Sequence, residues 1–426
     1  MRVVTIGMLG CGNIGCGVLK LLNDFSADMR HRQGLQFFVK KILVSQLGKK
    51  RPDIVPSDRL TTRPEDVTDD SGIELIIECM GGENPATELM IRALKNGKTV
   101  VTANKMALAL NWHLLDQAAK EGKAGLYFEA AVGGAMPIIR MLSDSLQANH
   151  TDRLTAIING TTNYILTRMA DEGLEYSQAL SEAQRLGFAE PDPAADVDGE
   201  DAVYKLSVLA SLAFHARIPV CCVQREGMTT VARYDIEAAR NLGYAIRLLA
   251  IAARDGSSVD THVSPTLIPL AHPLASVKGP FNAVYLHGDS YGDMMIYGRG
   301  AGSAPTASAI MGDVLYAIDR GKPEYPTFEN LTDSLSPALH VAQDRNCAFY
   351  LRLSAKDTPG VLAHVAGCLS KAGVSVRAIL QPEERKTGCA QITILTHPTF
   401  EKDMRKAANE FDTRYVTLMN LFRVEE

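Results

Sequence analysis

The chain has 426 residues, which is more than one ordinary domain holds and predicts two or three domains. Hydrophobic residues make up 46% and charged residues 22%, as in folded globular proteins, so the composition excludes a largely disordered chain. The 44 basic and 49 acidic side chains give a net charge of -5 without a long basic run, which argues against nucleic acid as a partner.

The N-terminus begins with an apolar run that leads directly into a glycine loop. It lacks the small-residue cleavage site of a signal peptide, so we expect it to form the first β-strand. No run reaches the ~18 apolar residues that a membrane-spanning helix needs, and no membrane association is expected. The eight cysteines are scattered, with only Cys221 and Cys222 adjacent and no CxxC pair, which is typical of reduced thiols in the cytoplasm.

Short apolar runs alternate with helical periods through residues 1–134. Strands are expected at 3–9, 37–44, 74–80 and 99–103, and helices at 16–29, 85–96 and 112–120. Because strands and helices alternate, the pattern predicts an α/β fold with a parallel sheet and right-handed crossovers, the Rossmann dinucleotide-binding type. Glycines in the run GLYFEAAVGGAMPII interrupt the alternation and place the first domain boundary at residue 134.

Residues 135–320 combine helices and strands in an irregular order. Helices are expected at 137–146, 162–172, 176–186 and 200–214, which favours an α+β domain with its own substrate pocket. Residues 321–346 mix Pro, Gly, Asp and Ser and indicate a linker. From residue 347 to 426 the order of elements is βαββαβ, which predicts a ferredoxin-like module.

The motif GCGNIG follows the first strand and opens the first helix. Its glycines are Gly10, Gly12 and Gly15, with Asn13 and Ile14 between the second and the third. In a dinucleotide-binding loop the first glycine permits a tight turn, the second lets backbone N–H groups approach the pyrophosphate, and the third lets helix and strand pack closely. The motif therefore predicts a dinucleotide site, and a glycine turn without nucleotide is the less favoured interpretation.

The end of the second strand bears on the choice between NAD and NADP. An acid there would hold the ribose hydroxyl of NAD. The chain instead has Ser45 and Gln46, followed by Lys49, Lys50 and Arg51. Cations at this position suit the 2'-phosphate of NADP, so NADP is the expected cofactor and NAD stays an alternative. A solvated basic loop without a cofactor role is the other interpretation of the three cations.

Four carboxylates precede one lysine in ADVDGEDAVYK, residues 195–205. A calcium loop is excluded because, with the glycine at its sixth position, its twelfth ligand would fall on Lys205. A helix that begins just after the glycine instead puts Asp201 and Lys205 on one face. A surface ion pair is the ordinary interpretation. The helix is apolar nearly all round, however, so we expect a buried Lys205 that transfers a proton, with Glu190 and Asp196 upstream to bind a substrate amine.

These motifs together resemble homoserine dehydrogenase, and the resemblance spans the whole chain. It rests on GCGNIG at 10–15, TANK at 102–105, FEAAVGGAMPII at 128–139, NGTTNYIL at 159–166, GFAEPDPAADVDGEDAVYK at 187–205 and GRGAGSAPTASAIMGD at 298–313. The resemblance implies an NAD(P)-dependent oxidoreductase that interconverts L-aspartate 4-semialdehyde and L-homoserine in threonine, methionine and isoleucine biosynthesis.

The resemblance also implies roles for single residues. Lys205 resembles the catalytic acid/base of the family, with Asp201 beside it and Lys105 as a rival for the proton transfer. The implied substrate-binding residues are Glu190, Asp196, Gly160 and Thr161. With the glycine loop and the basic cluster, the expected cofactor-binding residues are Gly10, Gly12, Asn13, Ile14, Gly15, Lys49, Lys50, Arg51, Asn104, Lys105 and Gly300. Glu129, Val132 and Gly134 resemble a loop that holds a monovalent cation such as Na+ or K+.

One position in the GFAEPDP motif departs from the family pattern. Many homoserine dehydrogenases carry tyrosine where this chain has Phe188. The change removes a hydroxyl group from the expected edge of the substrate pocket.

The C-terminal module resembles an ACT domain, a βαββαβ fold that binds small amino acids. Its signal is KDTPGVLAHV, in which Asp357, Pro359 and Gly360 form the turn before the first helix, where backbone N–H groups can hold a carboxylate. The resemblance implies threonine as an allosteric ligand, and a structural pairing module without ligand is the alternative. Gln381 and Glu383 follow the second strand, and no asparagine stands there to hold an amine.

Two other functions compete with homoserine dehydrogenase. A different Rossmann oxidoreductase that acts on an amino-acid aldehyde or keto acid is disfavoured by the long GFAEPDPAADVDG run. An inactive amino-acid sensor is disfavoured because Lys205 and Glu190 are both present. The resemblance implies that the central domain is catalytic and forms the dimer, so we expect a homodimer or, with paired ACT domains, a homotetramer.

Overall fold

The computed structural model describes residues 1–320, 334–342, 344–382 and 389–425. The chain divides into two compact units. The first comprises Met1–Leu154, Tyr204–Val223 and Asn282–Leu339, and the second comprises Thr155–Val203, Gln224–Phe281 and His340–Glu426. Residues 321–333 and 343 of the predicted linker 321–346 lie outside the described residues, and its described part contains strand β13 (His340–Val341) and the first residue of β14 (Asn346–Lys356). The domain boundaries after residues 134, 320 and 346 stay predictions.

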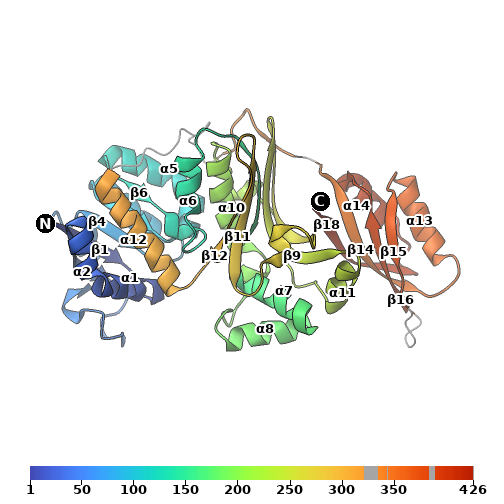
Figure 1. The fold of residues 1–426 in the computed structure, drawn as a ribbon, viewed down its shortest axis with the longest axis horizontal. Coiled ribbons are helices and arrows are strands. Elements are labelled where there is room, and N and C mark those ends of the chain that lie inside the picture. The colour runs from blue at the N-terminus through green and yellow to red at the C-terminus, as the bar shows by residue number, and fades with distance from the viewer. Residues whose placement is uncertain (321–333, 343, 383–388, 426) are drawn as a thin grey trace. The chain divides into compact units, whose positions relative to one another are not determined.

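The first unit contains a six-stranded parallel sheet in the order β3-β2-β1-β4-β5-β6 (Figure 1). Its strands are β1 (Arg2–Leu9), β2 (Leu35–Leu43), β3 (Leu60–Thr61), β4 (Leu75–Glu78), β5 (Thr99–Thr102) and β6 (Leu126–Tyr127). This strand order is that of the dinucleotide-binding fold, which confirms the predicted fold class. Ligands of such sheets bind at the carboxyl ends of the strands, where the order reverses, and here that point is the end of β1.

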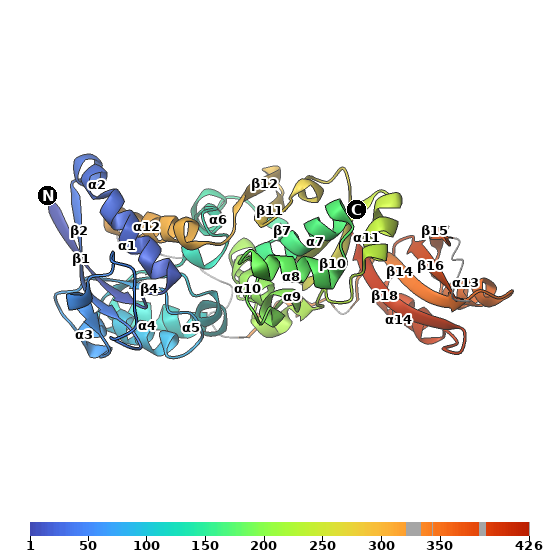
Figure 2. The same ribbon diagram turned by 90° about the horizontal axis from the view of Figure 1, so that it is seen from below.

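Helices cover both faces of this sheet (Figure 2). On one face α1 (Asn13–Asp24) and α12 (Ser303–Arg320) share a hydrophobic core with the strands, and α4 (Ala86–Lys95) and α5 (Lys105–Gly122) lie on the other. The single helix predicted at 16–29 is wrong, because the backbone leaves the helical region at Phe25 and divides it into α1 and α2 (Ser26–Gln33). The short α3 (Glu65–Thr68) and a 3-10 turn (Ser57–Arg59) had no clear sequence signal.

The other elements of the first unit follow the sheet. Helix α6 (Ile138–Arg140) continues as a π-helix (Met141–Ser145), where a regular helix was predicted over 137–146. Strands β7 (Thr151–Ile157), β11 (Phe281–Gly288) and β12 (Gly292–Arg299) pair in the order β12-β11-β7, and β7 begins in the first unit and ends in the second. Helix α10 (Glu200–Ala213) begins in the second unit and ends in the first. Two further 3-10 turns are Glu129–Ala131 and Val220–Cys222.

The second unit combines helices with a long antiparallel hairpin. Its helices are α7 (Gly160–Glu172), α8 (Tyr176–Arg185), α9 (Ala194–Val197) and α11 (Arg233–Asn241), with a 3-10 turn at Pro273–Ser276. The hairpin is formed by β9 (Tyr244–Asp255) and β10 (Ser258–Pro269), and β8 (Gln224–Arg225) pairs with β10. The helices predicted at 162–172, 176–186 and 200–214 are confirmed by α7, α8 and α10.

The C-terminal module is the last part of the second unit along the chain, and its elements have the predicted βαββαβ order (Figure 1). It consists of β14 (Asn346–Lys356), α13 (Val361–Lys371), β15 (Val376–Leu380), β16 (Cys389–Thr396), α14 (Glu401–Asn409) and β18 (Val416–Val424), with the short β17 (Thr399–Phe400). The strands lie in the order β18-β14-β16-β15, and apolar residues of both helices and the sheet form one core. On its other edge β18 pairs with β10, so the module shares a sheet with the hairpin.

Candidate active site

The three glycines of the GCGNIG loop have three different surroundings. Gly10 has a φ of +95°, and a Cβ there would lie 2.9 Å from the carbonyl oxygen of Cys79, so only glycine fits. A Cβ on Gly15 would lie 3.0 Å from the carbonyl oxygen of Gly10, which lets α1 pack tightly on the loop. A Cβ on Gly12 would meet nothing within 4 Å. The loop therefore has the tight turn, the open approach and the close packing that the motif predicts.

The N-terminus of α1 suits an anion. Gly12 is its N-cap and has no side chain to bind the first N–H groups, and the first turn carries no acid. The positive end of the helix dipole and the backbone N–H groups thus face open space, as a pyrophosphate requires. Ser303, the first residue of α12, donates a hydrogen bond to the carbonyl oxygen of Asn13 at 2.6 Å. This contact brings the end of the GRGAG segment to the same loop.

Of the three cations after β2, Arg51 is fixed by hydrogen bonds within its own loop. Its guanidinium donates to the carbonyl oxygens of Gln46 at 2.7 Å and Lys49 at 2.9 Å, so it closes the loop on itself. Burial raises the pKa of the Cys11 thiol to about 12, and the charge of Arg51 partly opposes this shift, which means that Arg51 lies near the glycine loop. Lys49 and Lys50 are exposed. The solvated-loop interpretation therefore fits the two lysines better than Arg51.

The TANK turn is held by a buried carboxylate at the end of β4. Glu78 is fully buried and accepts hydrogen bonds from Thr102 Oγ1 at 2.5 Å and from the backbone N–H of Met80 at 2.7 Å. Burial raises its pKa, and these hydrogen bonds oppose the shift. Asn104 caps α5, because its Oδ1 accepts from the N–H of Ala107 at 3.1 Å. Lys105 is the first residue of α5 and is partly exposed.

The residues of the predicted cation loop lie in one buried turn. Gly134 has a φ of +58°, and a Cβ there would lie 2.6 Å from the carbonyl oxygen of Arg299, so the turn packs on the GRGAG segment. Gly300 is equally crowded, since a Cβ on it would overlap the side chain of Asn282. Val132 is fully buried in extended backbone. These contacts explain the glycines, and the cation site itself stays a prediction.

The carboxylate of Glu129 is committed to the backbone of α6. It accepts hydrogen bonds from the N–H groups of Ile139 at 2.8 Å and Arg140 at 2.9 Å. Its own N–H donates to Asp313 on α12 at 2.8 Å, and Arg140 contacts the same carboxylate at 2.7 Å. Burial, with the nearby Asp313, raises the pKa of Glu129 to about 7, and burial raises that of Asp313 to about 6. Two buried acids here share one arginine.

In the second unit, Asn159 binds two of the predicted site acids at once. Its Nδ2 donates to Asp196 Oδ1 at 2.7 Å and to Asp201 Oδ2 at 2.9 Å. Its Oδ1 accepts from the N–H of Thr162 at 2.9 Å and so caps α7. The motif NGTTNYIL does not reveal this role of Asn159, because its one local signal is that of a cap residue before a helix.

Lys205 and Asp201 lie one turn apart on α10, and both side chains are buried. Each residue is only 7% exposed. The interpretation as a surface ion pair is therefore wrong, and the burial expected from the apolar helix is confirmed. A lysine that the fold removes from water needs compensating partners or a chemical task.

The GFAEPDP segment is tied to the start of α7. Thr161 Oγ1 donates to the carbonyl oxygen of Phe188 at 2.7 Å, and the Phe188 ring lies 4.7 Å from that of Tyr164. A Cβ on Gly160 would lie 2.8 Å from the carbonyl oxygen of Pro280, so this position accepts only glycine. Glu190 is exposed, unlike Asp201. The structure thus joins the two motifs and leaves the Glu190 carboxylate accessible.

The predicted site residues fall into two groups. In the first unit, packing and hydrogen bonds bring the glycine loop and Ser303 together, and likewise the cation loop and the GRGAG segment. In the second unit, hydrogen bonds unite Asp196 with Asp201 and join Thr161 to the GFAEPDP segment. Helix α10, which carries Asp201 and Lys205, runs from the second unit into the first.

A cavity of about 290 Å³ lies at the turn before α13 in the C-terminal module. It is lined by residues 356–362, Gln381 and Ile392. Gly360 caps α13 with a φ of +95°, and no side chain binds the first N–H groups of this helix. The position therefore suits the carboxylate of a small ligand, as the sequence predicted. Glu383, the other candidate for an amine contact, lies outside the described residues.

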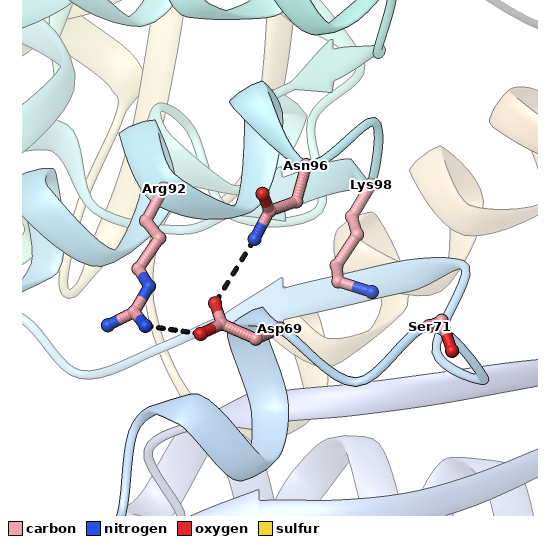
Figure 3. A pocket seen from close by; sticks show the side chains of 5 residues that line it. All are labelled: Asp69, Ser71, Arg92, Asn96 and Lys98. Carbon is pink, nitrogen blue, oxygen red and sulfur yellow. Dashed lines mark hydrogen bonds and ion pairs between the residues drawn. The ribbon is translucent and has the colours of Figure 1, made fainter.

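A larger cavity, of about 510 Å³, lies on the Rossmann sheet away from the glycine loop. Its lining includes Asp69 and Lys98, which lie in the segments that lead into β4 and β5 (Figure 3). It is therefore at the amino ends of the strands, whereas dinucleotides bind at the carboxyl ends. Asp69 is paired with Arg92 and Asn96, as the figure shows. This cavity is a surface feature distinct from the predicted cofactor site.

Two negative findings apply to the described residues. None of the helices that the structure describes is long and apolar enough to cross a membrane. Within those same ranges, His, Cys, Asp and Glu side chains form no group of three or more that could hold a metal ion.

Comparison with known proteins accounts for nearly the whole chain. Residues 10–129 match the NAD binding domain of homoserine dehydrogenase, residues 137–315 match the homoserine dehydrogenase family, and residues 349–413 match the ACT domain. A homoserine dehydrogenase of Synechocystis sp. is 40% identical over 421 residues, which cover 96% of this chain and 95% of the relative.

Solved structures agree with the family matches. The crystal structure of a homoserine dehydrogenase from Thiobacillus denitrificans has a TM-score of 0.91 and 36% identity, and the match covers 100% of this chain and 99% of that one. A hyperthermophilic archaeal homoserine dehydrogenase in complex with NADPH has a TM-score of 0.64 and 26% identity, over 75% of this chain and 98% of that one. The chain therefore belongs to the homoserine dehydrogenase family and is an NAD(P)-dependent oxidoreductase that acts on a CH–OH group.

Proposed function

We propose that the chain interconverts L-aspartate 4-semialdehyde and L-homoserine for threonine, methionine and isoleucine biosynthesis, with Lys205 as the acid/base. The observation that carries the proposal is the buried pair on α10. Lys205 follows Asp201 by one turn, both are 7% exposed, and Asn159 ties Asp201 to Asp196. One buried cation beside two joined carboxylates suits a substrate that carries both a reacting oxygen and an ammonium group.

Lys205 has one task in each direction of the reaction. In reduction, its ammonium stabilises the negative charge that develops on the aldehyde oxygen and then donates a proton to it. In oxidation, the neutral amine accepts the hydroxyl proton of homoserine. Oxidation is therefore expected to accelerate at alkaline pH, where more of the lysine is neutral. Lys105, at the start of α5, is the rival for this proton transfer.

The substrate ammonium is held by the carboxylates of the second unit. Asp196 and Asp201 each use an oxygen to accept from Asn159, and carboxylate oxygens have further lone pairs for a cation. Glu190 is exposed and accessible to the same substrate. Gly160 and Thr161 shape the backbone beside these acids. Phe188 leaves the pocket edge without the hydroxyl that a tyrosine would supply.

NADP is the cofactor proposed for this site, and NAD is the alternative. The glycine loop fits the pyrophosphate, because Gly12 borders open space and no side chain caps α1. Arg51 is a fixed cation near this loop and suits a 2'-phosphate, with Ser45 at the strand end. The archaeal relative solved with NADPH supports the same choice. Once bound, the nicotinamide supplies or accepts the hydride.

A monovalent cation, Na+ or K+, is proposed at the turn that contains Val132 and Gly134. Backbone oxygens are the ligands that this turn offers, and hard cations prefer oxygen. Glu129 already accepts two backbone N–H groups, so it would contribute mainly its charge. Omitting Na+ and K+ from the assay tests whether the cation is required.

The C-terminal module is proposed to bind L-threonine as an allosteric ligand. The cavity before α13 and the uncapped helix N-terminus support a small carboxylate there. A homodimer, or a homotetramer with paired modules, is the proposed assembly. All eight cysteines are free thiols, which supports a cytoplasmic enzyme.

The first experiment compares oxidation of NADPH and of NADH by L-aspartate 4-semialdehyde, with and without L-threonine. The variants are Lys205→Ala and Lys105→Ala, with Lys278→Ala as a surface control whose lysine pairs with Asp171. Lys205→Ala should lower kcat by about 100-fold or more, the scale of a lost general acid. A larger loss of kcat in Lys105→Ala than in Lys205→Ala would assign proton transfer to Lys105.

Two outcomes would overturn parts of this proposal. A wild-type protein that turns over neither cofactor would favour the inactive amino-acid sensor. An active enzyme that ignores threonine would leave the C-terminal module as a pairing domain.

A further inference from the structure

Two arginines of the C-terminal module bind one glutamate that lies far away in the sequence. The Arg423 side chain on β18 is 5% exposed, and its Nη2 lies 3.2 Å from Glu226 Oε1 and 3.1 Å from Glu401 Oε1. Arg405 Nη2 on α14 lies 3.4 Å from the same Glu226 oxygen. Burial would lower the pKa of Arg423, but the two carboxylates raise it above its ordinary value. Glu226 therefore contacts a guanidinium that stays charged.

The backbone beside Glu226 contacts the loop that precedes α10. The N–H of Glu226 donates to the carbonyl oxygen of Val263 on β10 at 2.8 Å. The N–H of Met228 donates to the carbonyl oxygen of Val197 at 2.9 Å. Between them, a Cβ on Gly227 would lie 3.1 Å from that Val197 oxygen. The two segments therefore contact each other through their backbones, and a side chain at position 227 would be crowded between them. A displacement of one segment should thus be transmitted to the other.

A second anchor fixes the same segment a few residues later. Asp235 on α11 is fully buried and accepts from Tyr350 Oη at 3.0 Å and Asn420 Nδ2 at 2.7 Å. Asn420 Nδ2 also donates to the carbonyl oxygen of Thr230 at 2.9 Å. Arg352 lies 3.0 Å from the Asp235 carboxylate. The C-terminal module thus holds segment 224–235 at both ends.

The loop at 197–200 leads directly into the proposed substrate site. Asp196 stands just before it and Asp201 just after it, and Asn159 binds both carboxylates. Lys205 follows one turn later on the same helix. Because Asp201 and Lys205 share α10 and Asp196 lies on α9, a shift of the loop would move Asp196 relative to the other two.

We propose that Glu226 is a positioning residue that couples the C-terminal module to the substrate site through segment 224–235 and loop 197–200. A ligand that displaces β18 or α14 would move Arg423, Arg423 would move Glu226, and the loop would follow. The proposal rests on the proposed function, because it takes Asp196 and Asp201 as the groups that bind the substrate amine. It adds the route by which the module reaches them.

The route predicts which binding step is affected. Segment 224–235 and the loop lie in the second unit, whereas the glycine loop lies in the first. Loss of the Glu226 contact should therefore raise the KM for L-homoserine and leave the KM for NADP+ unchanged.

The direct test measures backbone hydrogen exchange of the peptide 194–204 by mass spectrometry in the full chain. Glu226→Gln keeps the shape of the side chain and removes its charge. Glu237→Gln is the matched control, because Glu237 lies on α11 in an exposed ion pair with Arg233. Exchange in this peptide should be about fivefold faster in Glu226→Gln, the lower end for coupled sites, and unchanged in the control. Equal exchange in the two variants would overturn the proposal.

Steady-state kinetics supply the functional readout. Glu226→Gln should raise the KM for L-homoserine by about fivefold or more without changing that for NADP+. A rise in both KM values together with a lower melting temperature would indicate a merely structural role and overturn the proposal. If the wild type does not oxidise homoserine at all, the proposed function fails, and the exchange experiment still decides whether Glu226 fixes the loop.

A double-mutant cycle separates coupling from coincidence. In Arg423→Lys a single ammonium cannot span Glu226 and Glu401 as the guanidinium fork does. The effects of Arg423→Lys and Glu226→Gln on homoserine KM should be clearly less than additive in the double variant, because both remove the same contact. Additive effects would sink the assignment of this pair as the link.

Discussion

Two buried charge clusters, one in each unit, behave in opposite ways. In the acidic cluster, Glu129 and Asp313 share Arg140, and their pKa values rise to about 7 and about 6, chiefly because of burial. The balanced cluster consists of the acids Asp260, Glu401 and Glu226 and the arginines that contact them, Arg345, Arg405 and Arg423. Burial opposes ionisation of Asp260, but His262 and Arg345 outweigh it and lower its pKa to about 2.

Glu401 belongs to the same balanced cluster. Burial opposes its ionisation as well, yet Arg423 and Arg405 lower its pKa below the ordinary value. The acidic cluster is the more deeply buried one, since Glu129 and Asp313 are 5% and 3% exposed, whereas the side chains of Asp260 and Glu401 are 22% and 12% exposed. The balanced cluster also has more cations per carboxylate, and both differences favour the ionised form of its acids.

The largest effect is expected from removing a cation of the balanced cluster. Arg423→Met removes the buried cation that Glu226 and Glu401 share and leaves them Arg405, whose side chain is 53% exposed, while Glu401 is largely buried. The free energy of unfolding should fall by about 3–5 kcal/mol, as when one partner of a buried pair is deleted. Urea denaturation at neutral pH measures it. A loss as small as that of an exposed pair would show that the cluster is not balanced as described.

The acidic cluster predicts stability that declines as pH rises. The pKa of Glu129 is about 7 in the folded protein and 4.5 ordinarily. Its contribution is therefore fully present below about pH 4.5 and is lost as pH rises through about 7. Glu129→Gln should remove roughly 3 kcal/mol of this pH dependence. Unfolding free energies of both proteins at several pH values test this, and parallel curves would contradict it.

The balanced cluster predicts the opposite pH dependence, with stability that declines as pH falls. The pKa of Asp260 is about 2 in the folded protein and 3.8 ordinarily, so its contribution is present above 3.8 and is lost as pH falls through about 2. Asp260→Asn should cost about 2 kcal/mol at pH 7 and almost nothing near pH 2. Acid denaturation of variant and wild type should therefore converge, and a constant offset between them would contradict the assignment.

The smallest effect is expected from an exposed pair of the Rossmann sheet. Arg92 contacts Asp69 and Glu65 at the rim of the cavity in Figure 3, with 42% of its side chain exposed. Water and salt screen such pairs, so Arg92→Gln should leave the melting temperature unchanged within error. A marked loss would mean that exposure does not separate this pair from the buried clusters.

Local patterns predicted much of the fold. The alternation of strands and helices predicted the parallel sheet, and the βαββαβ order predicted the C-terminal module. The apolar surround of α10 predicted that Lys205 is buried. Each of these signals lies within a short stretch of sequence, where the period of apolar residues and the glycine positions already determine the structure.

The missed features depend on contacts between distant residues. Asn159 binds Asp196 and Asp201, which lie 37 and 42 residues away, and nothing in its neighbours indicates this. Glu226 meets Arg423 across 197 residues. The break at Phe25 and the π-helix at Met141–Ser145 are likewise set by packing that no local pattern encodes. The roles of the site residues stay predictions, to be tested by the variants above.

The open space at Gly12 has a consequence for engineering the coenzyme. A pyrophosphate bound as proposed would meet only backbone N–H groups there. NAD and NADP both contain this pyrophosphate, so the loop would not distinguish them. In the proposed binding mode, discrimination would depend on Ser45 and Arg51 after β2. The residues proposed for affinity and those proposed for selectivity thus lie in separate segments. It should therefore be possible to change the coenzyme preference without redesigning the loop that binds the coenzyme.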